Sequence, residues 1–186
     1  MSQSSSLSAD HIPLANEGVE PAADAHLVRR LVTAVNADGR SYFAEDSRAP
    51  RLTVIAGHPS FVATDVWRTT QTPVQNAGPA DDGLGEPVGI EAPAEGSLFR
   101  IVEFPPDSQF GDGADLKALM HHRTASLDYV IVLSGEIWAV LDADERLMSP
   151  GDVVIQRGTA HSWSNRSAAP ALVAFIMIGG TAEPAD

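Results

Sequence analysis

Short runs of alternating apolar and polar residues fill the chain from about residue 26 onward, and no long stretch keeps a helical period. The runs are rich in β-branched residues and end at Gly, Pro, Asn or Asp, residue types that are common in turns. Many short strands with tight turns predict an all-β sandwich or barrel. The clearest strands are expected in SLFRIVEF (97–104), LDYVIVLSGE (127–136), IWAVLDAD (137–144), ERLMSPGDVVIQRG (145–158), TAHSWSNRS (159–167) and APALVAFIMIGG (169–180).

Extra strands are expected before this set. HLVRRLVTAVNADGRSYF (26–43) contains Asn-Ala-Asp-Gly, a turn signal between two extended arms, and strands are also expected in 51–57 and 60–70. The segment 71–96 is rich in Gly, Pro and acidic residues, which predicts a long loop without regular structure. Short helices are expected only in 8–16 and 112–120.

The chain of 186 residues suits one domain with a sizeable core. Residues 1–25 are rich in Ser, Ala, Pro and acidic residues and show no clear period, so we expect a mobile tail followed by a single domain over 26–186. Net charge is -13, which argues against nucleic acid and anionic membranes as partners, because both need a concentrated positive field. No run of eighteen apolar residues and no signal peptide is visible, so a cytoplasmic location is expected.

Candidate chemistry centres on adjacent His121 and His122, on Asp128 at the start of a predicted strand, and on His161 downstream. If a hairpin joins the histidines to Asp128, cross-strand neighbours lie about 5 Å apart. Alternation places Asp128 on the face of Val130 and Val132, where a carboxylate needs a compensating partner. Two imidazoles and one carboxylate are a common ligand set for divalent iron, manganese, nickel or zinc. The absence of cysteine excludes thiolate ligands.

Simpler readings of these residues stay open. Asp128 can pair with Arg123 or Arg157 and leave no metal site, and the two histidines can be exposed at a strand end. Arg123 and Arg157 can instead bind a substrate carboxylate in bidentate fashion. Trp163 shares a predicted face with His161 and either fills the core or stacks on an aromatic substrate.

Two segments resemble the signature motifs of the cupin superfamily, small β-barrels of the double-stranded β-helix (jelly-roll) type. Six residues separate Asp128 from Gly135, so Asp128 takes the position of the glutamate in the first motif. Gly151, Gly158, His161 and Asn165 match the second motif, which places His161 at its ligand histidine. The resemblance covers about residues 99–178 and implies a cupin barrel with extra N-terminal strands.

The departures from the motifs change the expected ligand set. The His-x-His pair of the family falls on His122 and Thr124, or on His121 and Arg123, so one motif histidine is missing in either alignment. Arg157 stands where proline is usual, and the second motif is one residue short before Gly158. The resemblance therefore implies at most three protein ligands: His122 (or His121), Asp128 and His161.

The resemblance implies an enzyme that acts at a divalent metal, with no organic cofactor, on a small oxygenated or anionic molecule. Cupins include dioxygenases, decarboxylases, isomerases and lyases, and the sequence does not choose among them. The alternative is a metal-free barrel that binds a small ligand without chemistry, which the missing histidine favours. Cupins of this size usually pair through N-terminal strands, so a homodimer through 27–35 is also expected.

Overall fold

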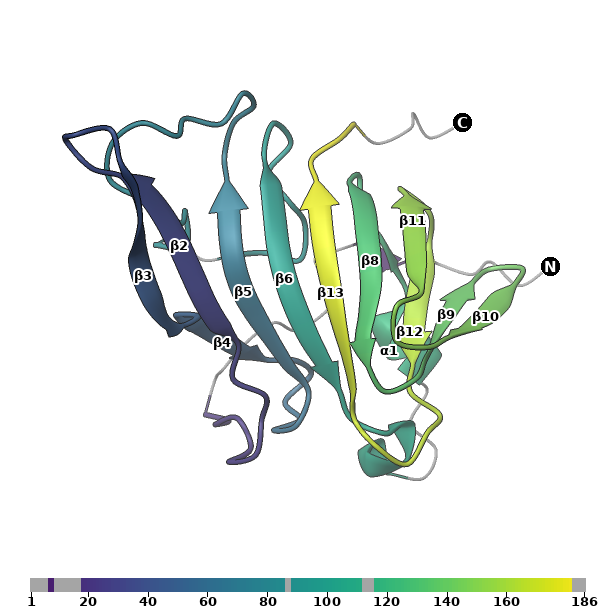
Figure 1. Ribbon diagram of the computed structural model, residues 1–186. Coiled ribbons are helices and arrows are strands. Elements are labelled where there is room, and N and C mark those ends of the chain that lie inside the picture. The colour runs from purple at the N-terminus through teal and green to yellow at the C-terminus, as the bar shows by residue number, and fades with distance from the viewer. Residues whose placement is uncertain (1–6, 9–17, 86–87, 112–115, 182–186) are drawn as a thin grey trace.

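The computed structural model describes residues 7–8, 18–85, 88–111 and 116–181, and it is built almost entirely from β-strands (Figure 1). Two larger sheets face each other, and a two-stranded hairpin stands beside them. The strands are β1 (Leu7–Ser8), β2 (Arg29–Val35), β3 (Ser41–Arg48), β4 (Arg51–Val54), β5 (Val62–Thr69), β6 (Ser97–Phe104), β7 (His122–Arg123), β8 (Leu127–Ser134), β9 (Ile137–Leu141), β10 (Glu145–Met148), β11 (Val153–Arg157), β12 (His161–Ser164) and β13 (Ala171–Ile178).

The six-stranded sheet has the order β11-β8-β13-β6-β5-β4, and the five-stranded sheet has the order β1-β7-β12-β9-β10. Consecutive strands repeatedly cross between the two sheets, as in a jelly-roll barrel, so segments far apart in the sequence become neighbours. The main core lies between the inner faces of the sheets. Its most buried side chains include Leu98, Val130, Val132, Ile137 and Val173, each at most 1% exposed.

The observed strands confirm the predicted all-β barrel and its extra N-terminal strands. β6 spans the predicted run 97–104 in full, and 26–43 forms the β2–β3 hairpin with its turn at Asn36–Gly39. In 112–120 a short helix, α1 (Leu116–Met120), forms, and a short 3-10 helix, η2, spans Asp107–Phe110. The helix expected in 8–16 lies outside the described residues, except for Ser8 in β1. Across the described ranges, no helix is long and apolar enough to span a bilayer.

One predicted pairing is wrong. β7 and β8 are not partners in a hairpin, because Thr124–Ser126 carries the chain from the five-stranded sheet to the six-stranded sheet. β7 pairs instead with β12, with His122 directly opposite His161, and with β1 in parallel. β8 pairs with β11 and β13. The two histidines therefore meet within one sheet, while Asp128 approaches from the other.

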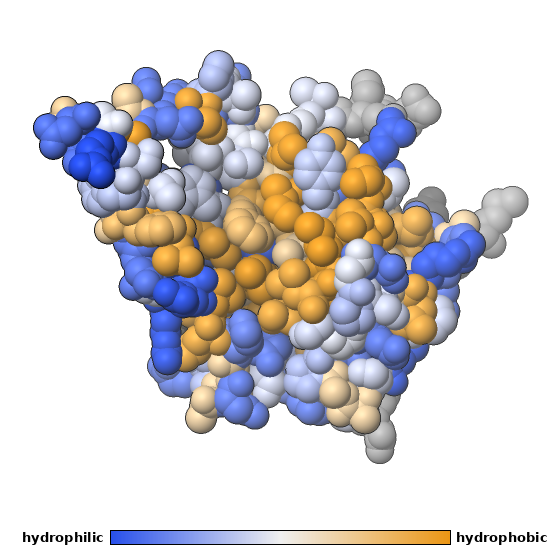
Figure 2. Space-filling view, viewed as in Figure 1, coloured by the Kyte–Doolittle hydropathy of each residue, from blue (hydrophilic) through white to orange (hydrophobic). Residues whose placement is uncertain are grey.

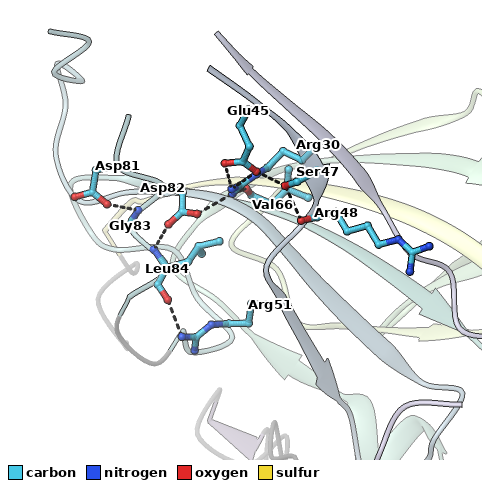
Figure 3. Close-up of polar contacts among 10 residues, drawn as sticks. All are labelled: Arg30, Glu45, Ser47, Arg48, Arg51, Val66, Asp81, Asp82, Gly83 and Leu84. Atoms are coloured by element: carbon cyan, nitrogen blue, oxygen red, sulfur yellow. Dashed lines mark hydrogen bonds and ion pairs between the residues drawn. The ribbon is translucent and has the colours of Figure 1, made fainter. Parts of the chain in front are cut away.

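The described parts of the 71–96 loop contain no regular structure, as predicted, but polar contacts fix them to the barrel (Figure 3). Arg30 on β2 binds Asp82 of the loop at 2.8 Å and also donates to the carbonyl of Val66 on β5. Arg51 on β4 donates to the carbonyl of Leu84 at 2.6 Å. These contacts join the hairpin, the loop and the edge of the six-stranded sheet.

The outer face of the six-stranded sheet is hydrophobic over β6, β13 and β8 (Figure 2). Isolated exposed apolar residues are normal, but a continuous patch of this kind marks an interaction surface. The β2–β3 hairpin adds further exposed apolar side chains beside it. The exposed apolar residues of the hairpin are Leu31, Val35, Tyr42 and Phe43, and those of β8 and β11 are Tyr129, Leu133, Val153 and Ile155.

We expect a second copy of this chain to cover this face. An apolar face is complementary to itself, so two acidic chains can associate through it without opposite charges. Light scattering at micromolar concentration should give the mass of a dimer. Ile155→Lys, at a position that is 54% exposed, should shift the protein toward monomer without unfolding it. A monomeric wild-type protein would refute this expectation.

Candidate metal and ligand site

A cavity opens between the two sheets and combines an apolar wall with a few polar groups. It contains about 520 Å³ of space free of protein atoms, a volume that includes open solvent. Its polar lining residues are Arg100, His122, Thr124, Asp128 and His161. Its apolar lining residues are Ile55, Phe61, Ile90, Val102, Phe104, Met120, Trp163, Phe175 and Met177.

His122 and His161 lie together because they are direct partners across β7 and β12, with ring centroids 4.2 Å apart. Both rings bind a backbone carbonyl through Nδ1: His122 contacts the Met120 carbonyl and His161 the Thr159 carbonyl, each at 2.8 Å. A carbonyl oxygen only accepts hydrogen bonds, so each Nδ1 carries the proton. Nε2 of each neutral ring is therefore unprotonated and able to act as a metal ligand.

Burial keeps both rings neutral. It lowers the pKa of His161 to about 3, and the nearby His122 adds to this effect. The pKa of His122 is also lowered, again mainly by burial, although its hydrogen bond to the Met120 carbonyl opposes the shift. Neutral imidazole is the form that binds metal ions.

Asp128 enters the same cavity from β8, opposite Gln156 on β11. The Gln156 amide donates to Asp128 Oδ2 at 2.9 Å and lies 3.1 Å from His161 Nε2, so it bridges the carboxyl and the imidazole. Burial raises the pKa of the Asp128 carboxyl, although the nearby Ser126 hydroxyl and the Gln156 amide oppose this shift. Asp128 Oδ1 is buried and has no hydrogen-bond partner in the described part of the chain.

The structure separates the two alternative first histidines. His122 is 6% exposed and lines the cavity, whereas His121 does not line it. His121 Nε2 instead lies 3.0 Å from Asp142 Oδ1, outside the cavity. Alternation along β7 sends neighbouring side chains to opposite faces, so only one of the two can face inward. The motif position is therefore taken by His122.

Arg123 and Arg157 are not brought to the cavity. Both are exposed, and each follows an inward-facing neighbour, His122 or Gln156, so strand alternation turns both arginines outward. Neither pairs with Asp128, whose partner is the neutral amide of Gln156. Trp163 does line the cavity and is 5% exposed, with its ring 6.1 Å from that of His161.

Sequence reasoning missed two residues of the site: Arg100, which lines the cavity, and Gln156, which bonds Asp128 and His161. Arg100 is the only charged residue in the inward-facing series of β6, which otherwise reads Leu98, Val102 and Phe104, and that interruption was a usable signal. Gln156 gave no such signal, because the apolar Ile155 next to it on β11 faces outward while the polar Gln156 faces inward.

The cavity has the donor types that a divalent ion prefers. Both imidazoles present an unprotonated Nε2, and Asp128 Oδ1 has no hydrogen-bond partner among the described residues, so the chemistry of the set fits such an ion. Across residues 7–8, 18–85, 88–111 and 116–181, no three acidic or histidine side chains converge on one point as they stand. The Gln156 amide lies between Asp128 and His161 in this arrangement.

The protein is similar to several curated fungal proteins, although no protein-family model matches the chain. Phomopsin biosynthesis cluster protein C' of Diaporthe leptostromiformis is 39% identical over 145 residues, which cover 74% of this chain and 70% of that protein. The cupin-domain-containing oxidoreductase fogC of Aspergillus ruber is 32% identical over 165 residues, 85% of this chain and 75% of that protein. The cupin-domain-containing oxidoreductase virC of Hypocrea virens is 33% identical over 150 residues, 78% of this chain and 71% of that protein.

Solved structures also resemble the barrel. A Cupin 2 conserved barrel domain protein from Salinispora arenicola is 15% identical and matches 64% of this chain and 76% of that chain, with a TM-score of 0.40. The similarity to fogC and virC extends over most of both chains. The chain belongs to the cupin superfamily.

Proposed function

We propose that this protein is an enzyme that acts at a divalent metal ion on a small oxygenated or anionic organic molecule. The observation that carries the proposal is the pair of buried imidazoles whose Nδ1 protons are fixed on backbone carbonyls, which leaves both Nε2 atoms unprotonated. An ion would take the place of the Gln156 amide at His161 Nε2. The names of fogC and virC support an oxidoreductase among the reaction classes that cupins include.

His122 and His161 would hold the ion, with Asp128 as the third ligand from the opposite sheet. Iron, manganese, nickel and zinc all suit two imidazoles and a carboxylate. When bound, such an ion supplies a Lewis acid that polarises a carbonyl or carboxylate oxygen, or activates water or dioxygen. Trp163 and Phe175 form part of the apolar wall, which would exclude bulk water and pack against the body of the substrate.

A second candidate function is a metal-free barrel that binds a small ligand without chemistry. The bridge from Gln156 to both Asp128 and His161 favours it, because this network satisfies three buried groups without an ion. The missing histidine at Thr124 favours it as well. The two candidates share the cavity and differ in the metal.

Elemental analysis separates the two candidates. Protein purified without an affinity tag that binds metal, and without chelators, is expected to carry close to one divalent ion per chain. The same metal content, close to one ion per chain, is expected after the metal is removed and iron, manganese, nickel and zinc are supplied in turn. A protein that retains none of the four after reconstitution would contradict the enzyme and support the metal-free binder.

A further inference from the structure

We propose that Arg100 forms a second polar subsite of the cavity, which binds the carboxylate of a ligand with an apolar body. This inference deepens the proposed function, because it assigns a substrate class to the same cavity. The argument starts from the guanidinium, which is unusual in an apolar wall. Arg100 is 5% exposed and lines the cavity.

Two of the three nitrogens of this guanidinium are used within the protein. Nε donates to Asp65 Oδ1 on β5 at 2.6 Å, and Nη2 donates to the Gly89 carbonyl of the 71–96 loop at 3.0 Å. Nη1 makes no hydrogen bond to the part of the chain that the structure describes. Because Arg100 lines the cavity, its Nη1 protons are available to an acceptor on a bound ligand.

The position of Arg100 suits a ligand that reaches toward the histidines. Arg100 lies opposite Phe175 on β13, and Asp128 lies opposite Met177 on the other side of the same strand. Phe175 and Met177 both line the cavity, so an apolar floor separates the two polar ends. Two strand spacings, about 10 Å, lie between β6 and β8, which a molecule of one ring with short substituents can span.

The aromatic wall and the Arg100 guanidinium together indicate the class of ligand. Four aromatic side chains, Phe61, Phe104, Trp163 and Phe175, form the apolar wall in a chain of ring contacts between 5.2 and 6.3 Å. Such a wall suits an aromatic body. The best acceptor for a guanidinium N–H is a carboxylate oxygen, since both partners are charged. The expected ligand is thus an aromatic or similarly apolar carboxylate.

Substitution of Asp65 tests this proposal, because the direction of the change in ligand affinity can be predicted. Its carboxylate is 1% exposed and neutralises Arg100. Asp65→Asn keeps the guanidinium and removes the competing negative charge, so a ligand carboxylate should bind more tightly. Asp65→Asn combined with Arg100→Gln removes both charges and leaves two amides, which avoids an unpaired buried charge and keeps the variant folded. A purely structural Arg100–Asp65 pair would not give opposite effects in the two variants.

Calorimetric titration with benzoate tests the subsite, with toluene as the probe that has the ring without the carboxylate. All proteins are treated with chelator, so the result is independent of metal. Compared with wild type, we expect benzoate affinity to rise in Asp65→Asn and to fall by at least about tenfold in the double variant. Toluene binding should change little in either. Arg51→Gln is the matched control, because Arg51 binds the same loop at Leu84 but does not line the cavity.

Three results would overturn the subsite: no saturable benzoate binding to wild type at millimolar concentration, equal affinity in wild type and the double variant, or weaker binding in Asp65→Asn. The proposed function fails on a different result, the absence of metal. Benzoate binding that depends on Arg100 in a protein that never holds a metal would leave the subsite standing and turn the protein into a carboxylate-binding module.

Discussion

His161→Ala and His122→Ala are each expected to abolish stable metal binding while leaving the barrel folded. Each ring supplies one of the two unprotonated imidazole nitrogens of the proposed site, and a site left with a single imidazole loses most of its affinity. Replacing residues that only support metal ligands already costs about 10–100-fold in affinity, so loss of a ligand should cost more than about 100-fold. The measurement is metal content after reconstitution and dialysis, with circular dichroism to confirm the fold.

His121→Ala is the matched control for this pair. His121 precedes His122 directly but faces Asp142 instead of the cavity, so the variant should keep the wild-type metal content. Equal loss of metal in His121→Ala and His122→Ala would mean that the ion lies elsewhere. Retention of the metal in both His122→Ala and His161→Ala would remove the basis of the proposed enzyme.

Asn165→Ala is expected to lower the free energy of unfolding by about 3–5 kcal/mol, which is near the upper end for a single substitution. Asn165 is 1% exposed and uses its whole amide group. Nδ2 donates to the carbonyls of Phe104 and Ala169, and Oδ1 accepts from the backbone and hydroxyl of Ser167. Alanine would leave several of these groups without partners, at about 1–3 kcal/mol for each buried one.

Chemical denaturation measures this effect, provided that the slope of the transition is unchanged. Ser167→Ala serves as the control, because it removes one contact to Asn165 and two exposed contacts to the Ala169 backbone, and it should cost about 1 kcal/mol or less. A loss in Asn165→Ala no larger than in Ser167→Ala would show that the bond to Phe104, which joins the end of β12 to the end of β6, carries little of the stability.

The same residue explains a match to the second cupin motif that sequence alone left without a role. Asn165 holds a turn and does not itself line the cavity, so its position in the motif reflects folding. The strands were largely predictable because each is short, β-branched and bounded by turn residues. The inward face of β8 also followed from alternation, with Asp128, Val130 and Val132 all buried.

The site was only partly predictable, for a topological reason. Three residues between two strands are typical of a hairpin, and nothing local reveals that Thr124–Ser126 passes from one sheet to the other. The pairing of His122 with His161 is set by that crossing and by a sequence separation of 39 positions. The metal and the homodimer stay predictions.

The arginines show how proximity along the sequence can mislead. Arg123 and Arg157 adjoin motif residues, yet in a strand the nearest neighbour in sequence points to the opposite face. Arg100 is more than twenty positions before the first motif histidine and still reaches the cavity, because it shares the inward register of β6. The two-residue alternation along a strand was therefore a better guide to the cavity residues than distance in sequence from the motif.

The two imidazole protons rest on main-chain oxygens, which has an evolutionary consequence. Since every residue type provides the same carbonyl, substitutions at positions 120 and 159 can alter shape and polarity nearby without changing which ring nitrogen is protonated. Lineages of this barrel can therefore remodel the immediate surroundings of the two rings for new substrates while the tautomers persist. Only a shift of the backbone itself would change them.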